Sequence, residues 1–198
     1  MAPVIQPPLG TAFRPHALGL AALWIMTLIC SAAPTHAQER PTPLERRVKA
    51  AFVYKFTGYI NWPPAAFAST DSVFVIGVIG DDEFEDDLSR TVKGRTVEGR
   101  PIEVRSIDEM SGAGTPQVLY VAGTDPRPLR RAIAMLGAKP CLIITERRGA
   151  LAQGSVINFL LDNGHVRFEI SKAAADNRGL TLSSQLLGVA QIVVTELR

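Results

Sequence analysis

The spacing of apolar positions predicts a helix at each end of the folded part of the chain. The first apolar positions recur three or four residues apart, as on one face of a helix: Leu44, Val48, Phe52, Phe56 and Tyr59. Thr42 and Pro43 precede them, in the positions of an N-cap and a first-turn proline. At the other end, the apolar run LSSQLLGVAQIVV, residues 182–194, predicts one closing helix.

Strands and further helices are predicted between these two. The run SVFVIGVIG, residues 72–80, is almost continuously apolar and β-branched, which is typical of a strand covered on both faces. The other predicted elements are helix 81–92, strand 100–107, strand 117–123, helix 125–136, strand 140–145, strands 155–161 and 165–171, and helix 171–179. Asn163 and Gly164 supply the positive φ angles of a tight hairpin turn between the last two strands. This order predicts an α/β fold: a three-layer sandwich with a mostly parallel sheet, an antiparallel C-terminal hairpin and helices on both faces.

The start of the chain has the pattern of a secretory signal peptide. Arg14 and His16 precede an apolar run of fourteen residues, 17–30, which is shorter than the about 18 to 20 residues that normally span a membrane. Small residues follow, and cleavage is expected after Ala37, with Ala33 as the alternative. We therefore expect a signal peptide over 1–37 and a single α/β domain over 38–198.

Charge and cysteine content exclude some functions of the remaining chain. Of 21 basic and 19 acidic residues, only Arg14 lies before residue 38, so the net charge of 38–198 is 20 minus 19, or +1. This balance gives no indication of binding to nucleic acid. Cys141 is the one cysteine of this region and lies in the apolar run CLIIT, so we expect a buried, inert thiol and no internal disulfide.

The residues that commonly carry catalysis or bind metals are sparse. Six of the seven residues 81–87 are acidic and follow a strand, as do the magnesium-binding aspartates of receiver domains. No lysine follows a later strand suitably, so helix capping by Asp81 or Asp82 is the expected role. His165 is the only histidine of 38–198, which excludes a multi-histidine zinc site. We expect no catalytic residues, no metal and no cofactor.

Two segments contain candidate binding residues. In FTGYINWPPAAF, residues 56–67, Pro63 disfavours helix before it, so the first helix is expected to end at Asn61 and Trp62. This segment is interpreted as a packed corner, with a half-exposed Trp62 beside Phe67 on a partner surface as the alternative. Asn158 lies midway along an apolar strand, where its amide structures either the core or, with Arg167, a small-ligand pocket.

Several segments together resemble the YfiR-like family. They are FVYKFTGYINWPPAAF, FVIGVIGDDEFEDDL, GRPIEVRSI, ALAQGSVINFLLDNGHVRFEIS and GLTLSSQLLGVAQIV, and the resemblance covers about residues 44–194. It implies an exported, periplasmic α/β protein that forms dimers and has no catalysis. Well-known members carry disulfides, which the single Cys141 cannot form.

The resemblance also implies partners. In the best-known system the repressor binds the periplasmic part of an inner-membrane diguanylate cyclase and lowers cyclic-di-GMP synthesis, and an outer-membrane lipoprotein relieves it. We therefore expect a periplasmic regulatory protein that acts on an inner-membrane signalling protein and controls biofilm formation. The alternative is a periplasmic small-molecule binding protein or accessory sensor domain without enzymatic activity.

Overall fold

The computed structural model describes residues 41–107 and 114–196. The predicted signal peptide and its cleavage site lie outside these ranges. Within them, no helix has both the length and the apolar character that a membrane crossing requires.

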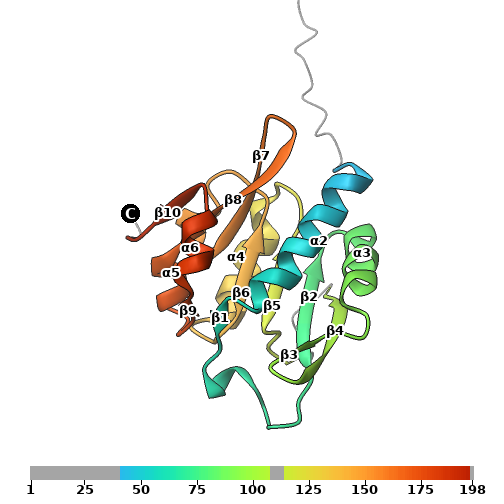
Figure 1. The fold of residues 1–198 in the computed structure, drawn as a ribbon. Helices are drawn as coiled ribbons and strands as arrows, with labels where there is room; N and C mark the ends of the chain where they lie inside the picture. Colours follow the sequence, from blue (N-terminus) through green and yellow to red (C-terminus); the bar gives the residue numbers. More distant parts are fainter. Residues whose placement is uncertain (1–40, 108–113, 197–198) are drawn as a thin grey trace, which may run out of the picture. The chain divides into compact units, whose positions relative to one another are not determined.

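The centre of the fold is an eight-stranded mixed sheet with the strand order β10-β8-β7-β6-β5-β2-β4-β3 (Figure 1). Its strands are β2 (Phe74–Ile79), β3 (Thr96–Val97), β4 (Arg100–Ser106), β5 (Val118–Val121), β6 (Leu142–Thr145), β7 (Ile157–Asp162), β8 (His165–Ser171) and β10 (Ile192–Val194). Neighbouring strands from β4 through β2, β5 and β6 to β7 are parallel, and β7 pairs antiparallel with β8. The predicted mostly parallel sheet with an antiparallel C-terminal hairpin is confirmed. Asn163 and Gly164, with φ of 50° and 76°, form its tight turn.

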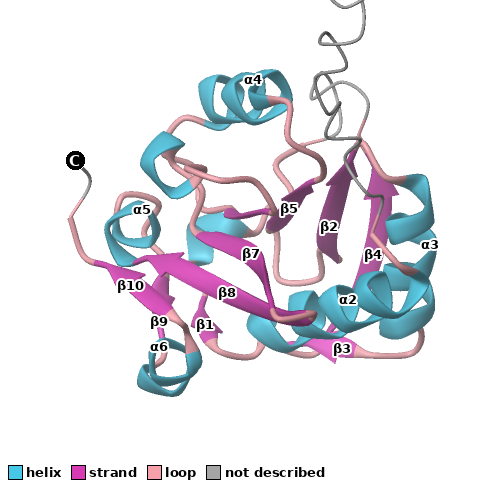
Figure 2. Cartoon of the chain, turned by 90° about the horizontal axis from the view of Figure 1, so that it is seen from above, coloured by secondary structure: helices cyan, strands magenta, loops and turns pink. Residues whose placement is uncertain are grey.

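Helices cover both faces of the sheet, which confirms the three-layer arrangement (Figure 2). The longer helices are α2 (Pro43–Thr57), α3 (Asp82–Val92) and α4 (Pro126–Leu136). On one face, α2 and α3 bury Phe56, Phe84 and Leu88 against the sheet. On the other, α4 buries Leu129 and Leu136, because alternate strand residues point to opposite faces.

Local sequence explains how these helices begin. The Oγ1 of Thr42 accepts the N–H of Glu45 at 3.2 Å, so Thr42 is the N-cap that the sequence predicts. Asp81 does the same for α3, with Oδ1 accepting the N–H of Phe84 at 2.9 Å. The acidic run after β2 therefore caps a helix, as expected. Within the described ranges, no cluster of three or more metal-ligating side chains occurs.

The prediction of one closing helix over residues 182–194 is wrong for about half of these residues. Residues 182–194 form the end of β9 (Thr181–Leu182), a short helix α6 (Ser184–Val189) and the strand β10. Ala190 is extended, with φ of −71° and ψ of 142°, and three β-branched residues follow Gln191. Such residues favour a strand once an unpaired sheet edge lies beside them, and β8 supplies that edge.

The end of the first helix also differs from the prediction. Helix α2 ends at Thr57, four residues before the predicted position, and Gly58 is its C-cap. Ile60 and Asn61 then form β1 (Ile60–Asn61), which pairs antiparallel with β9. The 3-10 turn η1 (Pro64–Ala66) and helix α5 (Lys172–Asp176) complete this part of the fold. The N–H of Gly58 donates to the carbonyl of Lys55 and the N–H of Tyr59 to that of Phe56, so tight three-residue turns end the helix before the proline is reached.

Candidate functional site

Strand β10 is an open edge of the sheet. It pairs in parallel with β8, and in the described part of the chain no strand lies on its other side. Ile192 is 49% exposed, Val193 is 37% exposed and the preceding Val189 is 71% exposed. An apolar strand with an unpaired edge is a ready site for pairing with another chain.

The backbone of β10 leaves hydrogen-bonding groups at this edge. The N–H of Gln191 donates to the carbonyl of Phe168 in β8 at 2.9 Å. Ser171 donates its N–H to the carbonyl of Val156 in β7, so its partner in β10, Val194, and likewise Ile192, turn their backbone groups toward β8. Backbone groups point alternately to the two sides of a strand, so the N–H and C=O of Val193 face away from β8. They are the groups with which an added strand would form its ladder.

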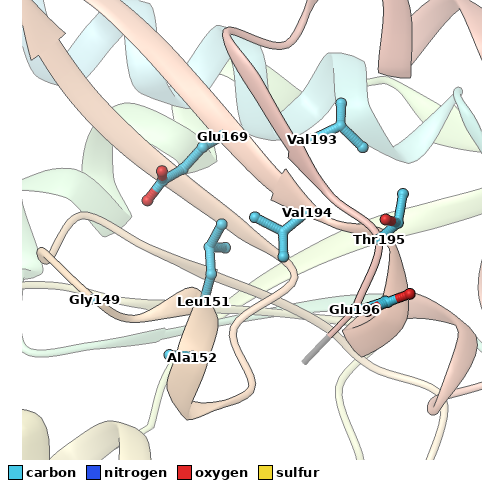
Figure 3. Close-up of a pocket in the computed structure, with 8 residues that line it drawn as sticks. All are labelled: Gly149, Leu151, Ala152, Glu169, Val193, Val194, Thr195 and Glu196. Atoms are coloured by element: carbon cyan, nitrogen blue, oxygen red, sulfur yellow. The ribbon is translucent and has the colours of Figure 1, made fainter. Parts of the chain in front are cut away.

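A pocket of about 570 Å³ opens beside this edge (Figure 3). Its walls come from β8, from β10 with the two residues after it, and from the loop that contains the 3-10 turn η2 (Leu151–Gln153). The lining residues are Gly149, Leu151, Ala152, Glu169, Val193, Val194, Thr195 and Glu196. Leu151 and Val194 point toward each other and form an apolar wall, while Val193 points to the other face (Figure 3). Glu169 and Glu196 are the charged members of this lining.

The carboxylate of Glu169 is held in place by a buried amide. Asn158 is 0% exposed, and its Nδ2 donates to Oε1 of Glu169 at 2.9 Å. The Oδ1 of Asn158 accepts the Thr145 hydroxyl at 2.7 Å and the N–H of Arg147 at 2.9 Å. All polar atoms of this amide are therefore fixed by the fold. Asn158 lies behind the pocket and orients one of its walls.

These hydrogen bonds decide between the two roles expected for Asn158, in the core or, with Arg167, in a small-ligand pocket. The amide of Asn158 structures the core, which was one of its two expected roles. Neither Asn158 nor Arg167 lines the pocket described above. Arg167 is exposed, on the same strand as Glu169. A direct role of either residue in binding stays a prediction.

Trp62 and Phe67 lie in the corner between α2 and β2, and the packed interpretation is confirmed. Trp62 is 8% exposed, its Nε1 donates to the carbonyl of Thr57 at 3.2 Å, and its ring meets Phe74 edge to face at 5.2 Å. The alternative of a half-exposed Trp62 is wrong, because the chain after Gly58 folds the indole inward. Phe67 is half-buried, with the Arg100 guanidinium 4.0 Å from its ring centre.

The carboxyl ends of the central strands, where open α/β sheets often bind ligands, are occupied by an internal ion pair. Lys49 of α2 is buried, and its Nζ lies 2.7 Å from Oε2 of Glu146, the residue after β6. The same Glu146 accepts the Tyr120 hydroxyl at 2.8 Å and the Gly123 N–H at 2.9 Å. Burial, followed by the charge of Glu146, raises the pKa of Tyr120. These contacts join α2 to the sheet, so we assign them a structural role.

Residue patterns alone did not reveal the β10 edge or Glu169. The last segment was predicted as helix, which hid the edge, and no role was predicted for Glu169. One signal was available: three consecutive β-branched residues, 192–194, favour a strand.

One comparison with known proteins identifies relatives of this chain. The model of the family described as YfiR/HmsC-like matches residues 46–191. No curated protein matches the chain.

Proposed function

The chain belongs to the YfiR/HmsC-like family, and on this premise we propose that it holds an inner-membrane diguanylate cyclase inactive by binding its periplasmic part. Members of this family are periplasmic and regulatory, not enzymatic, and take part in cyclic-di-GMP signalling. The cyclase as the specific partner is our proposal. One observation carries it to this chain: an apolar strand edge, β10, is left open beside a pocket with two carboxylates.

Repression by binding sets an energetic requirement. The repressor must bind the inactive form of the cyclase better than the active form, because equal affinity for both shifts no equilibrium. Changing a population from mostly active to mostly inactive needs about 5.5 kcal/mol of differential affinity. A strand ladder with a few buried anchors supplies energy of this order.

Export is part of the same proposal. The apolar run at 17–30 and the small residues before Gln38 support a cleaved signal peptide. Intact-mass analysis of the exported protein is expected to show a chain that starts near Gln38. A membrane-bound product that keeps Met1 would contradict this part.

The test of function is deletion of the gene. Cyclic-di-GMP and surface attachment are both expected to rise, because the cyclase loses its inhibitor. The wild-type gene should restore both, while a gene without codons 2–37 should not. Unchanged nucleotide levels after deletion refute the cyclase proposal and leave the alternative, a periplasmic small-molecule binder that uses the pocket beside β10.

Two further partners follow from the same family membership. We propose an outer-membrane lipoprotein that relieves repression and a homodimer of this chain. Phe67 and Arg167 are proposed partner- or ligand-binding residues. Trp62 and Asn158 are buried, so we propose only an indirect role for them: Trp62 shapes the corner and Asn158 orients Glu169. Light scattering on the exported protein tests the dimer: a monomer at micromolar concentration contradicts it.

A further inference from the structure

We propose that β10 and its pocket take up an extended segment of a partner protein, one that carries a lysine or arginine between apolar residues. This inference rests on the proposed function, because it specifies how the partner binds. The segment adds a ninth strand to the sheet along β10, and its basic side chain reaches Glu169. Each step depends on a feature of the described residues.

The first feature is the backbone of the edge. The N–H and C=O of Val193 face away from β8, and β10 has no neighbour on that side within the described ranges. An added strand lies about 4.8 Å away and can pair with these groups whatever its sequence. The ladder therefore contributes affinity, and the side chains must contribute specificity.

The second feature is the direction of the side chains. Ile192 pairs with Glu169 and Val194 with Ser171, and paired residues of neighbouring strands share a face. Every second residue of an added strand points to this same face, beside Val194 and Leu151. Glu169 lies two strand spacings, about 10 Å, from the added backbone. A long side chain that crosses β10 is needed to meet its carboxylate.

The third feature is charge. Among the eight lining residues, two are glutamates and none is basic. Glu169 is fixed by the buried Asn158, so it presents its carboxylate without a cost of ordering its own side chain. A lysine or arginine provides the complementary charge, and its aliphatic stem packs on Leu151 and Val194.

A second copy of this chain is a poorer occupant of the edge. Its own edge segment, residues 191–196, contains one glutamate and no basic residue. Pairing of two β10 strands would bring apolar residues together, and residues 191–196 of the second copy would offer Glu169 no counter-charge. The charge complementarity therefore favours a different protein.

A random octapeptide library displayed on phage tests this binding mode on the exported protein. On the wild type, selected peptides should be enriched in lysine or arginine at one position, with valine, isoleucine or threonine around it. On the double variant Glu169→Lys, Glu196→Lys, the enrichment should change to aspartate or glutamate. The matched control Glu98→Lys changes an exposed carboxylate beside β3, at the other end of the sheet, and should select the same peptides as the wild type.

Two measurements on the best selected peptide complete the test. Replacing its basic residue by norleucine should weaken binding roughly tenfold, as loss of one charge-assisted hydrogen bond does. Binding should also slow hydrogen exchange at the amide of Val193, which faces the open edge. A library without binders, no enrichment of basic residues, unchanged selection on the double variant, or an unprotected Val193 amide would each overturn the proposal. Loss of self-association in an Ile192→Lys variant would also overturn the proposal, because it would show that a second copy of the chain covers β10.

The same double variant separates this inference from the proposed function. Introduced into the gene, it should raise cyclic-di-GMP as deletion does, while the protein remains folded. If deletion raises the nucleotide and the double variant represses normally, the β10 site is wrong and the regulatory function stands. If peptides bind as described but deletion has no effect, the site stands and the cyclase proposal is wrong.

Discussion

Replacement of Asn158 tests how strongly the core holds the wall of the β10 pocket. In Asn158→Ala the Arg147 N–H loses its acceptor and Glu169 loses its donor, while the Thr145 hydroxyl keeps Ser155 Oγ at 2.9 Å. An unpaired buried N–H and a lost bond to a charged group each account for about 1.5 kcal/mol. The expected loss of unfolding free energy is therefore about 3 kcal/mol.

Asn158→Asp is the sharper change because it keeps the shape and both accepted bonds. It replaces the donor to Glu169 by a second carboxylate, 2.9 Å from the first. The new carboxylate is buried and Glu169 is partly buried, and at this distance the charge of one disfavours ionisation of the other, so the pKa of the pair rises above the ordinary value near 4. We expect a loss of about 4 kcal/mol at pH 7.

The sign of the pH effect follows from proton binding. Because the pKa of the carboxylate pair is raised in the folded variant, the folded state binds more protons than the unfolded state between the two pKa values. Stability of Asn158→Asp should therefore recover as pH falls from 7 to 5, which should not happen in Asn158→Ala.

Urea unfolding followed by tryptophan fluorescence at pH 7 and pH 5 measures these differences, since Trp62 is buried and reports the core. Asn61→Ala, a change of an exposed asparagine, is the control and should lie within about 0.5 kcal/mol of the wild type. Losses below 1 kcal/mol in both Asn158 variants, or the same pH dependence in both, would refute the assignment of this amide as the support of Glu169.

Three further predictions concern the interior of the fold. Cys141 is 0% exposed and burial raises its pKa to about 12, so a thiol reagent at pH 8 should react only as fast as the protein unfolds; rapid labelling of the native protein would contradict this. Lys49→Met leaves the partly buried Glu146 without its cation and should lower unfolding free energy by about 3 kcal/mol, measured by urea unfolding; a loss under 1 kcal/mol would show that the ion pair does not support α2. In Gly77→Ala the new Cβ would lie within 2.2 Å of the Ile107 side chain, so about 1 to 3 kcal/mol should be lost, and Gly77→Ala with Ile107→Val should recover part of it.

Residue patterns predicted the elements of this fold well where burial and local capping agree. Strand β2 is apolar because both of its faces are covered, and α3 begins at Asp81 because the carboxylate accepts a backbone N–H within the same turn. Such features depend on residues close in sequence, so the sequence determines them. The burial of Cys141 was predictable for the same reason.

Tertiary contacts decided the two ends of the domain. Residues 192–194 are apolar enough for a helix or a strand, and the unpaired edge of β8 makes them a strand. Trp62 is buried because its ring packs edge to face on Phe74 of β2, twelve residues later in the chain. Both outcomes depend on a partner supplied by the folded chain, over a sequence separation that local propensity does not reach.

The sequence by itself therefore determined the α/β class, the hairpin, the helix caps and, through its resemblance, the family. Only the tertiary structure decided which strand edge stays open and which carboxylate faces the pocket beside it. The physical reason is that a strand lies at an edge only when no other strand pairs with its outer side, which depends on the whole sheet. The position of Glu169 likewise depends on the hydrogen bond that Asn158 donates from the neighbouring strand.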